Sequence, residues 1–409
     1  GLLYLKQAYL IAEGNWKEGL ALYPWPFFSI LISIVHKTTN LHLQVVAHAV
    51  DLVLFAVAVM FYLKTLAFIY KQKHIIFYGG IILLSFIPIM DDYVGMVLRD
   101  HGLWAGCMMG TYFYFVYLKE NTFKNNLLWQ LSFAFAGLFR PEAFVFLVLI
   151  PLLHVFLFSK QQSKWLNIQK LMQHYLVVLG YALYVLINKV TMHSGEVVSD
   201  QGSRLGEFIP RLLSFFKQII SPLSITSDHP YLTDLLTNYP LTITFGILLA
   251  ILIVKWLNGI GLLIGGLLLY GLNKRLQNDL NASIKVSLYF FIGISFALVA
   301  INLFNVYVLS NRYWGYHWFW LFIFVTPFLA DFFDSKHSSI TTYLKPLVII
   351  FIAASIMSSL IDSQKSNIEA EAAQYFKNLG SIDSVKLVGG ERVGYYSGLS
   401  MKELIEALN

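Results

Sequence analysis

Arginine and carboxylate side chains gather at the ends of long apolar segments in this chain. Charged side chains are scarce in this chain: only 13% of the 409 residues are charged, whereas 57% are hydrophobic. An arginine guanidinium presents a planar fork that matches phosphate oxygens, and a carboxylate nearby can accept a proton from a hydroxyl group. Together these residue types suit transfer chemistry on a phosphate-linked group. The candidates are Asp91, Asp92, Arg99, Asp100, His101, Arg140, Glu142, Arg312 and Tyr313.

Apolar runs of transmembrane length recur along most of the sequence, and the charged candidates lie at the ends of these runs. A soluble domain lacks the interior to bury so much apolar sequence, so we expect an all-α polytopic membrane protein. The lone Cys107 lies inside one of these runs and is expected to be inert packing. The predicted spans are 41–63, 75–90, 103–118, 127–139, 143–158, 171–188, 241–256, 258–272, 286–310, 318–333 and 345–361.

The distribution of lysine predicts which side of the membrane each connection faces. Lysine-rich connections alternate with acidic or mixed ones, and the positive-inside rule places the former in the cytoplasm and the latter outside. In the C-terminal half this alternation of sides is consistent only if the segment 241–272 crosses the membrane once. The sequence of that segment, however, looks like two marginal apolar runs. The lysine-rich connections are 64–74, 119–126 and 159–170, and the others are 91–102, 140–142 and 189–240.

Three regions follow from this topology. Residues 1–40 are expected to form an external loop and an amphipathic helix at 25–36, with an upstream helix missing. Residues 41–361 form the transmembrane domain with a long external loop at 189–240. Two capping-box patterns predict a small external α/β tail at 362–409. The basic residues are scattered over short loops, which excludes a nucleic-acid-binding stripe.

The segment 91–102 allows two interpretations. If it is helical, Asp92, Met96 and Arg99 share one face, and Asp91 points about 100° away. One carboxylate would then face an arginine-bearing cleft. The alternative is a solvated loop with an ordinary salt bridge at a helix end.

The other charged positions are also open between structural and functional roles. Pro141 suits the first turn of a helix and Glu142 its positive end, whereas Arg140 at membrane depth needs a partner, often an anionic ligand. Arg312 is either a ligand-binding residue or a snorkelling interfacial anchor beside Tyr313. For Asp51, with His48 one turn before it, we favour an interhelical hydrogen bond over a functional role.

This pattern resembles the GT-C superfamily of membrane glycosyltransferases, in the branch of protein O-mannosyltransferases and the lipid A aminoarabinose transferase. The resemblance spans most of the chain through short motifs. In that branch the first external loop carries a catalytic acid a few positions before a tyrosine, and here that acid would lie before Gly1. The matching segments are Tyr4 to Ala8, Glu13-Gly14, Tyr23 to Pro26, Asp91 to His101, Arg140 to Glu142 and Arg312-Tyr313.

The resemblance implies a bundle of about 10–12 transmembrane helices and a polyprenyl-phosphate-linked sugar as donor, bound with its lipid among the helices. A hydroxyl or amine acceptor, deprotonated by Asp92 or Asp91, would attack the anomeric carbon with inversion. We expect Asp92 to be the better candidate because it shares a face with Arg99. A divalent metal stays an open question.

The remaining candidates of this site have supporting roles. Arg99, Arg140, Arg312 and His101 would hold the donor phosphate, with support from Glu142, Tyr313 and Asp100. The active site would face the exterior or periplasm of a bacterial plasma membrane. The rival class is a transporter or flippase of lipid-linked glycans, which would need ionisable groups near the bilayer midplane. A third, an interaction module in the tail, is disfavoured by the tail's short length.

Overall fold

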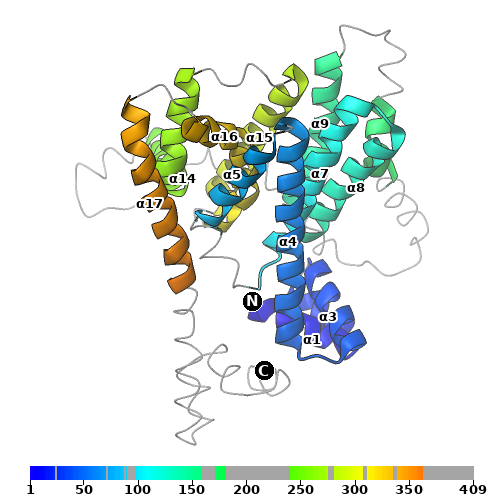
Figure 1. Ribbon diagram of the computed structural model, residues 1–409. Helices are drawn as coiled ribbons and strands as arrows, with labels where there is room; N and C mark the ends of the chain where they lie inside the picture. Colours follow the sequence, from blue (N-terminus) through cyan, green and yellow to red (C-terminus); the bar gives the residue numbers. More distant parts are fainter. Residues whose placement is uncertain are drawn as a thin grey trace, which may run out of the picture.

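The structure is a computed structural model, and it is helical throughout the part of the chain that it describes (Figure 1). The described residues are 1–23, 25–70, 72–86, 89, 97–158, 171–180, 240–274, 281–306, 311–334 and 339–362. No strand occurs among these residues. The predicted external loop at 189–240 and the predicted α/β tail at 362–409 lie outside them, apart from Pro240 and Asp362.

The N-terminal residues form three short helices that pack around the first end of the long helix α4 (Leu43–Tyr70) (Figure 1). They are α1 (Leu2–Ala12), α2 (Trp16–Leu22) and α3 (Phe27–Thr39). The buried amide of Gln7 ties α1 to α2, because its Nε2 donates to the carbonyl oxygens of Gly19 (2.9 Å) and Tyr23 (2.7 Å). The region expected to be an external loop therefore contains two helices, and the amphipathic helix expected at 25–36 corresponds to α3.

Helix α7 (Asp100–Glu120) lies between α4 and α8 (Phe123–Phe139) and is the centre of the first half of the fold. Glycines recur every fourth residue along its α8 side, which lets the two backbones approach closely. A Cβ placed at any of them would come within 2.3–2.6 Å of atoms of α8; the three are Gly102, Gly106 and Gly110.

The remaining helices complete the bundle around an aromatic core that includes Trp104, Trp129, Trp318 and Trp320, all fully buried. The short helix α5 (Lys73–Leu84) packs on α16, and the described segment 171–180 is helical apart from a turn at Tyr175. The other elements are η1 (Pro141–Ala143), α9 (Phe144–Phe158), α14 (Pro240–Lys274), α15 (Ala282–Val306), η4 (Asn311–Trp314), α16 (Gly315–Asp334) and α17 (Ser339–Asp362).

Helix α14 is broken where the sequence suggested two marginal runs. Gly261 has φ 63° and ψ 178°, a conformation that L side chains rarely adopt. The arms Phe245–Gly261 and Leu263–Gly271 meet at 93°. At 1.5 Å per residue the second arm is roughly 13 Å long, too short to cross a bilayer core of about 30 Å. The two runs therefore do not make two crossings.

Within the described residues, three helices are long and apolar enough to cross a membrane: Leu43–Tyr70, Ala282–Phe304 and Asn311–Asp334. A fourth is added if the two arms of α14 count as one span. Some predicted boundaries were wrong. The first span continues past residue 63 to Tyr70, and the helix expected at 75–90 ends at Leu84, with Ser85 as its C-cap.

Candidate functional site

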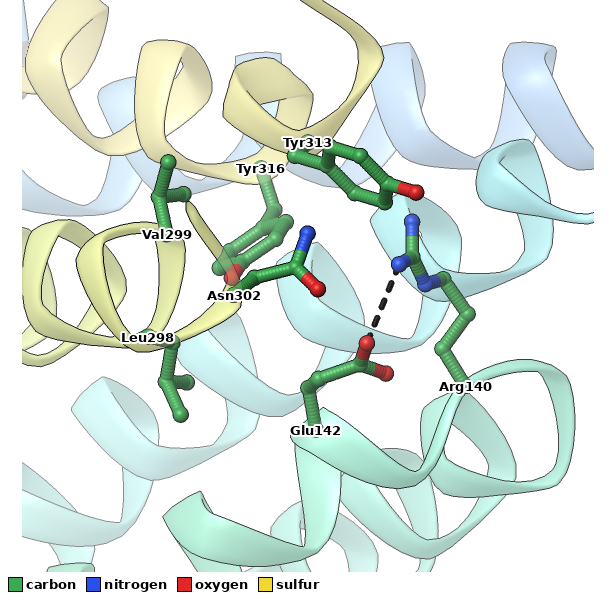
Figure 2. A pocket seen from close by; sticks show the side chains of 7 residues that line it. All are labelled: Arg140, Glu142, Leu298, Val299, Asn302, Tyr313 and Tyr316. Carbon is green, nitrogen blue, oxygen red and sulfur yellow. Dashed lines mark hydrogen bonds and ion pairs between the residues drawn. The ribbon is translucent and has the colours of Figure 1, made fainter. Parts of the chain in front are cut away.

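The charged positions of three separate connections meet around the carboxylate of Asp100, the first residue of α7. Arg140 Nη1 donates a hydrogen bond to Asp100 Oδ1. Arg140 Nη2 donates to Glu142 Oε1 at 3.0 Å (Figure 2). The guanidinium groups of Arg99 and Arg312 also lie close enough to interact electrostatically with Asp100. The structure thus brings together residues that are far apart in the sequence.

The local backbone explains how Arg140 reaches two carboxylates. α8 ends at Phe139, and Arg140 is extended (φ −147°, ψ 126°) before Pro141 begins η1. This extended residue carries the Arg140 side chain back toward α7, while η1 turns Glu142 to the same side. Arg140 is only 5% exposed. Its partners are protein carboxylates, so the structure shows directly what balances this buried charge.

The arginines keep the two carboxylates ionised. Asp100 and Glu142 both lie at the N-terminal ends of helical segments, before the apolar stretches begin. Burial alone would raise the pKa of Asp100, but Arg140, Arg99 and Arg312 outweigh it and lower that pKa below its usual value. The same balance of burial against Arg140 and Arg99 lowers the pKa of Glu142. Burial would lower the pKa of Arg140, yet Glu142 and Asp100 raise it well above the ordinary value.

Arg99 and Arg312 have no carboxylate hydrogen-bonded to them among the described residues. The Arg99 guanidinium lies 5.1 Å from the centre of the Tyr23 ring, and its buried Nη1 has no hydrogen-bond partner in the described part of the chain. Arg312 Nη2 donates to the Tyr313 hydroxyl at 3.3 Å. Two guanidinium groups lie close to the Tyr313 ring, with Arg140 at 4.6 Å and Arg312 at 5.2 Å from its centre.

Positive charge exceeds negative charge in this cluster. Three guanidinium groups face two carboxylates, which leaves one net positive charge among these five side chains. Both carboxylates are engaged by Arg140, so Arg99 and Arg312 retain hydrogen-bond donors for another anion. Such an anion would bring oxygen acceptors to a fork of N–H donors.

Asp51 of α4 contacts α7 and the segment before it, although its hydrogen bond goes to a non-helical residue and its contact with α7 is an ion pair. Its Oδ2 accepts a hydrogen bond from the Leu98 N–H at 3.2 Å, and its Oδ1 lies 2.8 Å from His101 Nδ1. His48, expected to act with Asp51, is exposed instead. His101 is 1% exposed and packs against Phe55. It therefore joins α4 to α7, and its expected contact with the donor phosphate stays a prediction.

The helical interpretation of 91–102 is wrong at its C-terminal end. Val97 and Leu98 are not helical, and α7 begins only at Asp100. The physical reason is that Asp51 holds the Leu98 N–H, which a continuous helix would use internally. Asp91 and Asp92 lie outside the described residues. The preference for Asp92 depended on one helical register running through to Arg99, so that preference loses its basis.

A hollow opens beside the arginine cluster and contains two residues that the sequence analysis missed (Figure 2). Including space open to solvent, it measures about 210 Å³. Asn302 of α15 and Tyr316 of α16 line it together with Arg140, Glu142 and Tyr313. Asn302 could have been noticed, because it is a polar residue within the apolar run 286–310 and such residues are costly at membrane depth.

The described residues contain no group of three or more His, Cys, Asp or Glu side chains placed to hold a metal ion. In the cluster itself Asp100 Oδ1 and Glu142 Oε1 each pair with Arg140, so the nearest charge to these two oxygens is a guanidinium group. The site is thus an arginine-rich cluster bordered by a polar hollow. Comparisons with protein-family models, with curated proteins and with solved structures find no match for this chain.

Proposed function

We propose that this chain is a membrane glycosyltransferase of the GT-C type that transfers a sugar from a polyprenyl phosphate to a hydroxyl or amine acceptor. The observation that supports this most is the convergence of Arg99, Arg140 and Arg312 on Asp100. These arginines come from three separate connections, and they outnumber the carboxylates at the mouth of an apolar helical bundle. A phosphate carried on an apolar chain combines the two matching properties.

The arginines would act on the leaving group. When the bond between the sugar and the phosphate breaks, negative charge grows on the phosphate oxygens. Arg99 and Arg312 carry fixed positive charge at that place, and preorganised charge of this kind lowers the barrier without reorganisation. Arg140 is held by Asp100 and Glu142, so its guanidinium is positioned before the donor arrives. Tyr313 contacts both Arg140 and Arg312.

The general base belongs elsewhere in this proposal. Asp100 and Glu142 are both ion-paired with Arg140, and their lowered pKa values make them weak bases. Asp92 and Asp91 therefore stay the proposed acceptor-activating pair, now without a preference between them. The expected bundle of about 10–12 helices, the external placement of the site and a bacterial plasma membrane complete the proposal.

The test is transfer of radiolabel from a polyprenyl phosphosugar to a total lipid and protein extract by the purified full chain. We expect Arg140→Ala and Arg312→Ala to lower the rate about 100-fold or more, the usual effect of removing one charge-stabilising group. Glu18→Gln, an exposed acid on α2, is the matched control and should leave the rate unchanged. Labelled lipid that crosses the bilayer without forming a new glycoside would instead identify a flippase.

A further inference from the structure

The hollow beside the arginine cluster contains polar atoms that the proposed phosphate site does not use. Glu142 Oε2, Arg140 Nε and Asn302 Nδ2 are all buried, and none has a hydrogen-bond partner among the described residues. Each is carried by a side chain that lines the same hollow. Buried polar atoms without a partner are costly, so their occurrence together indicates a group that is bound there.

The chemistry of these atoms defines what that group is. Glu142 Oε2 can only accept a hydrogen bond, whereas Arg140 Nε and Asn302 Nδ2 donate. A hydroxyl group donates one hydrogen bond and accepts two, which matches this set. A phosphate oxygen does not match it, because it would face the Glu142 carboxylate.

The shape of the hollow agrees with this assignment. Its enclosed part admits a group about the size of one water molecule, and the rest is open. One hydroxyl would therefore enter while the ring that carries it stays at the mouth. Leu298 and Val299 of α15 and the Tyr316 ring offer apolar surface to the C–H bonds of that ring (Figure 2).

We infer that the hollow between η1, α15 and α16 recognises a hydroxyl group of the donor's sugar, with Glu142 as its acceptor and Asn302 as its amide donor. This inference rests on the proposed function, because it assumes that the arginines beside the hollow hold the phosphate of the same donor. Arg140 links the two places: its Nη atoms bind carboxylates, while its side chain also lines the hollow and its buried Nε has no partner among the described residues.

The test compares two probes, undecaprenyl phosphate and undecaprenyl phosphoglucose, bound to the full chain in nanodiscs. The wild type should bind the sugar-bearing probe more tightly. Asn302→Leu, which preserves side-chain size, should reduce that preference about tenfold while leaving the affinity for undecaprenyl phosphate within roughly twofold. Glu142→Gln should act in the same direction, because an amide N–H replaces the accepting oxygen. Glu18→Gln should change neither affinity.

The outcomes separate this inference from the proposed function. Equal weakening of both probes by Asn302→Leu, or an unchanged preference in both variants, would show that the hollow holds only water. If Asn302→Leu does not fold, Asn302→Asp takes its place, since it keeps the shape and replaces the donor by an acceptor. A wild type that binds neither probe overturns the proposed function, whereas one that binds both equally overturns the hydroxyl site alone.

Discussion

At the scale of single residues, Asp100 is the carboxylate that interacts with all three arginines of the cluster. Its pKa is lowered in the folded chain, so the unfolded chain binds more protons and folding stability rises with pH. The stability from Asp100 is present above its usual pKa of 3.8 and disappears as the pH falls through the lower folded value. We expect Asp100→Asn to flatten the acid limb of a melting curve recorded in an uncharged detergent.

The same substitution should also lower stability at neutral pH, because it leaves Arg140 with one carboxylate where it had two. An acid limb as steep in Asp100→Asn as in the wild type would show that Asp100 is not ionised in the folded protein. Glu18→Gln is the appropriate comparison, since it removes an exposed acid of α2. Its acid limb should match that of the wild type.

Two arginines of the cluster should respond differently to removal. Arg140→Ala leaves Asp100 and Glu142 without their common partner, and breaking a buried ion pair costs about 3–5 kcal/mol. Arg99 contacts the Tyr23 ring and makes no hydrogen bond to a carboxylate among the described residues, so Arg99→Ala should cost about 1 kcal/mol. Both variants should weaken binding of a polyprenyl phosphate. Thermal unfolding and lipid binding, measured together, separate the two effects.

At the scale of helices, the glycines of α7 determine how closely α8 can approach. A Cβ on Gly106 would lie 2.6 Å from the backbone nitrogen of Ala136. Gly106→Val should therefore force the helices apart and cost about 1–3 kcal/mol or more. The single cysteine offers a direct readout, because Cys107 is fully buried and a thiol-reactive dye reports its exposure on heating.

A matched control lies on α15. A Cβ on Gly293 would meet nothing within 4 Å, so Gly293→Ala should be neutral or slightly stabilising, given the higher helix propensity of alanine. Equal melting temperatures for Gly106→Val and the wild type would contradict the close α7–α8 contact.

His317 joins three helices and must be neutral to do so. Trp256 Nε1 of α14 donates to His317 Nε2 at 3.0 Å, so the ring proton is on Nδ1. Nδ1 then donates to Ser295 Oγ of α15 at 2.7 Å, because that hydroxyl donates to the Ile292 carbonyl. His317→Phe keeps an aromatic ring but leaves Trp256 Nε1 and Ser295 Oγ without their hydrogen bonds to His317. Each loss should lower the free energy of unfolding by about 1–3 kcal/mol.

The readout for His317→Phe is the free energy of unfolding. Ser295→Ala provides the graded comparison, since it removes one of the two bonds and should cost less. A His317→Phe protein as stable as the wild type would mean that α14 and α15 are held to α16 by apolar packing alone.

At the scale of the whole molecule, the sequence predicts some features well and others poorly, for physical reasons. Apolar runs locate most helices. The alternation of lysine-rich with acidic or mixed connections groups Arg99, Arg140 and Arg312 at one end of the helical bundle. The pairing of Asp51 with His101 depends on how α4 packs on α7, which no local pattern encodes. Helices α1 and α2 were missed because they are too short to read as membrane spans, and the buried amide of Gln7 that joins them is a tertiary contact.

The orientation of the bundle in the membrane is the remaining property of the whole chain, and it decides where the arginine cluster acts. The predicted span 103–118 lies within helix α7, which has 21 residues and is about 31 Å long, so the proposed topology places Asp100 and Glu120 on opposite sides of a bilayer core of about 30 Å. Lys124 follows the far end of α7, and Glu18 belongs to the helices at the near end; both are exposed.

Single cysteines at these two positions, in a Cys107→Ala background, test the orientation. Lysine-rich connections stay in the cytoplasm, so a membrane-impermeant maleimide added to spheroplasts should label Glu18→Cys. Lys124→Cys should react only after permeabilisation. The reverse pattern would place the arginine cluster in the cytoplasm and overturn the external site. Labelling of both positions in intact spheroplasts would mean that α7 does not cross the membrane, because one crossing helix cannot have both ends outside.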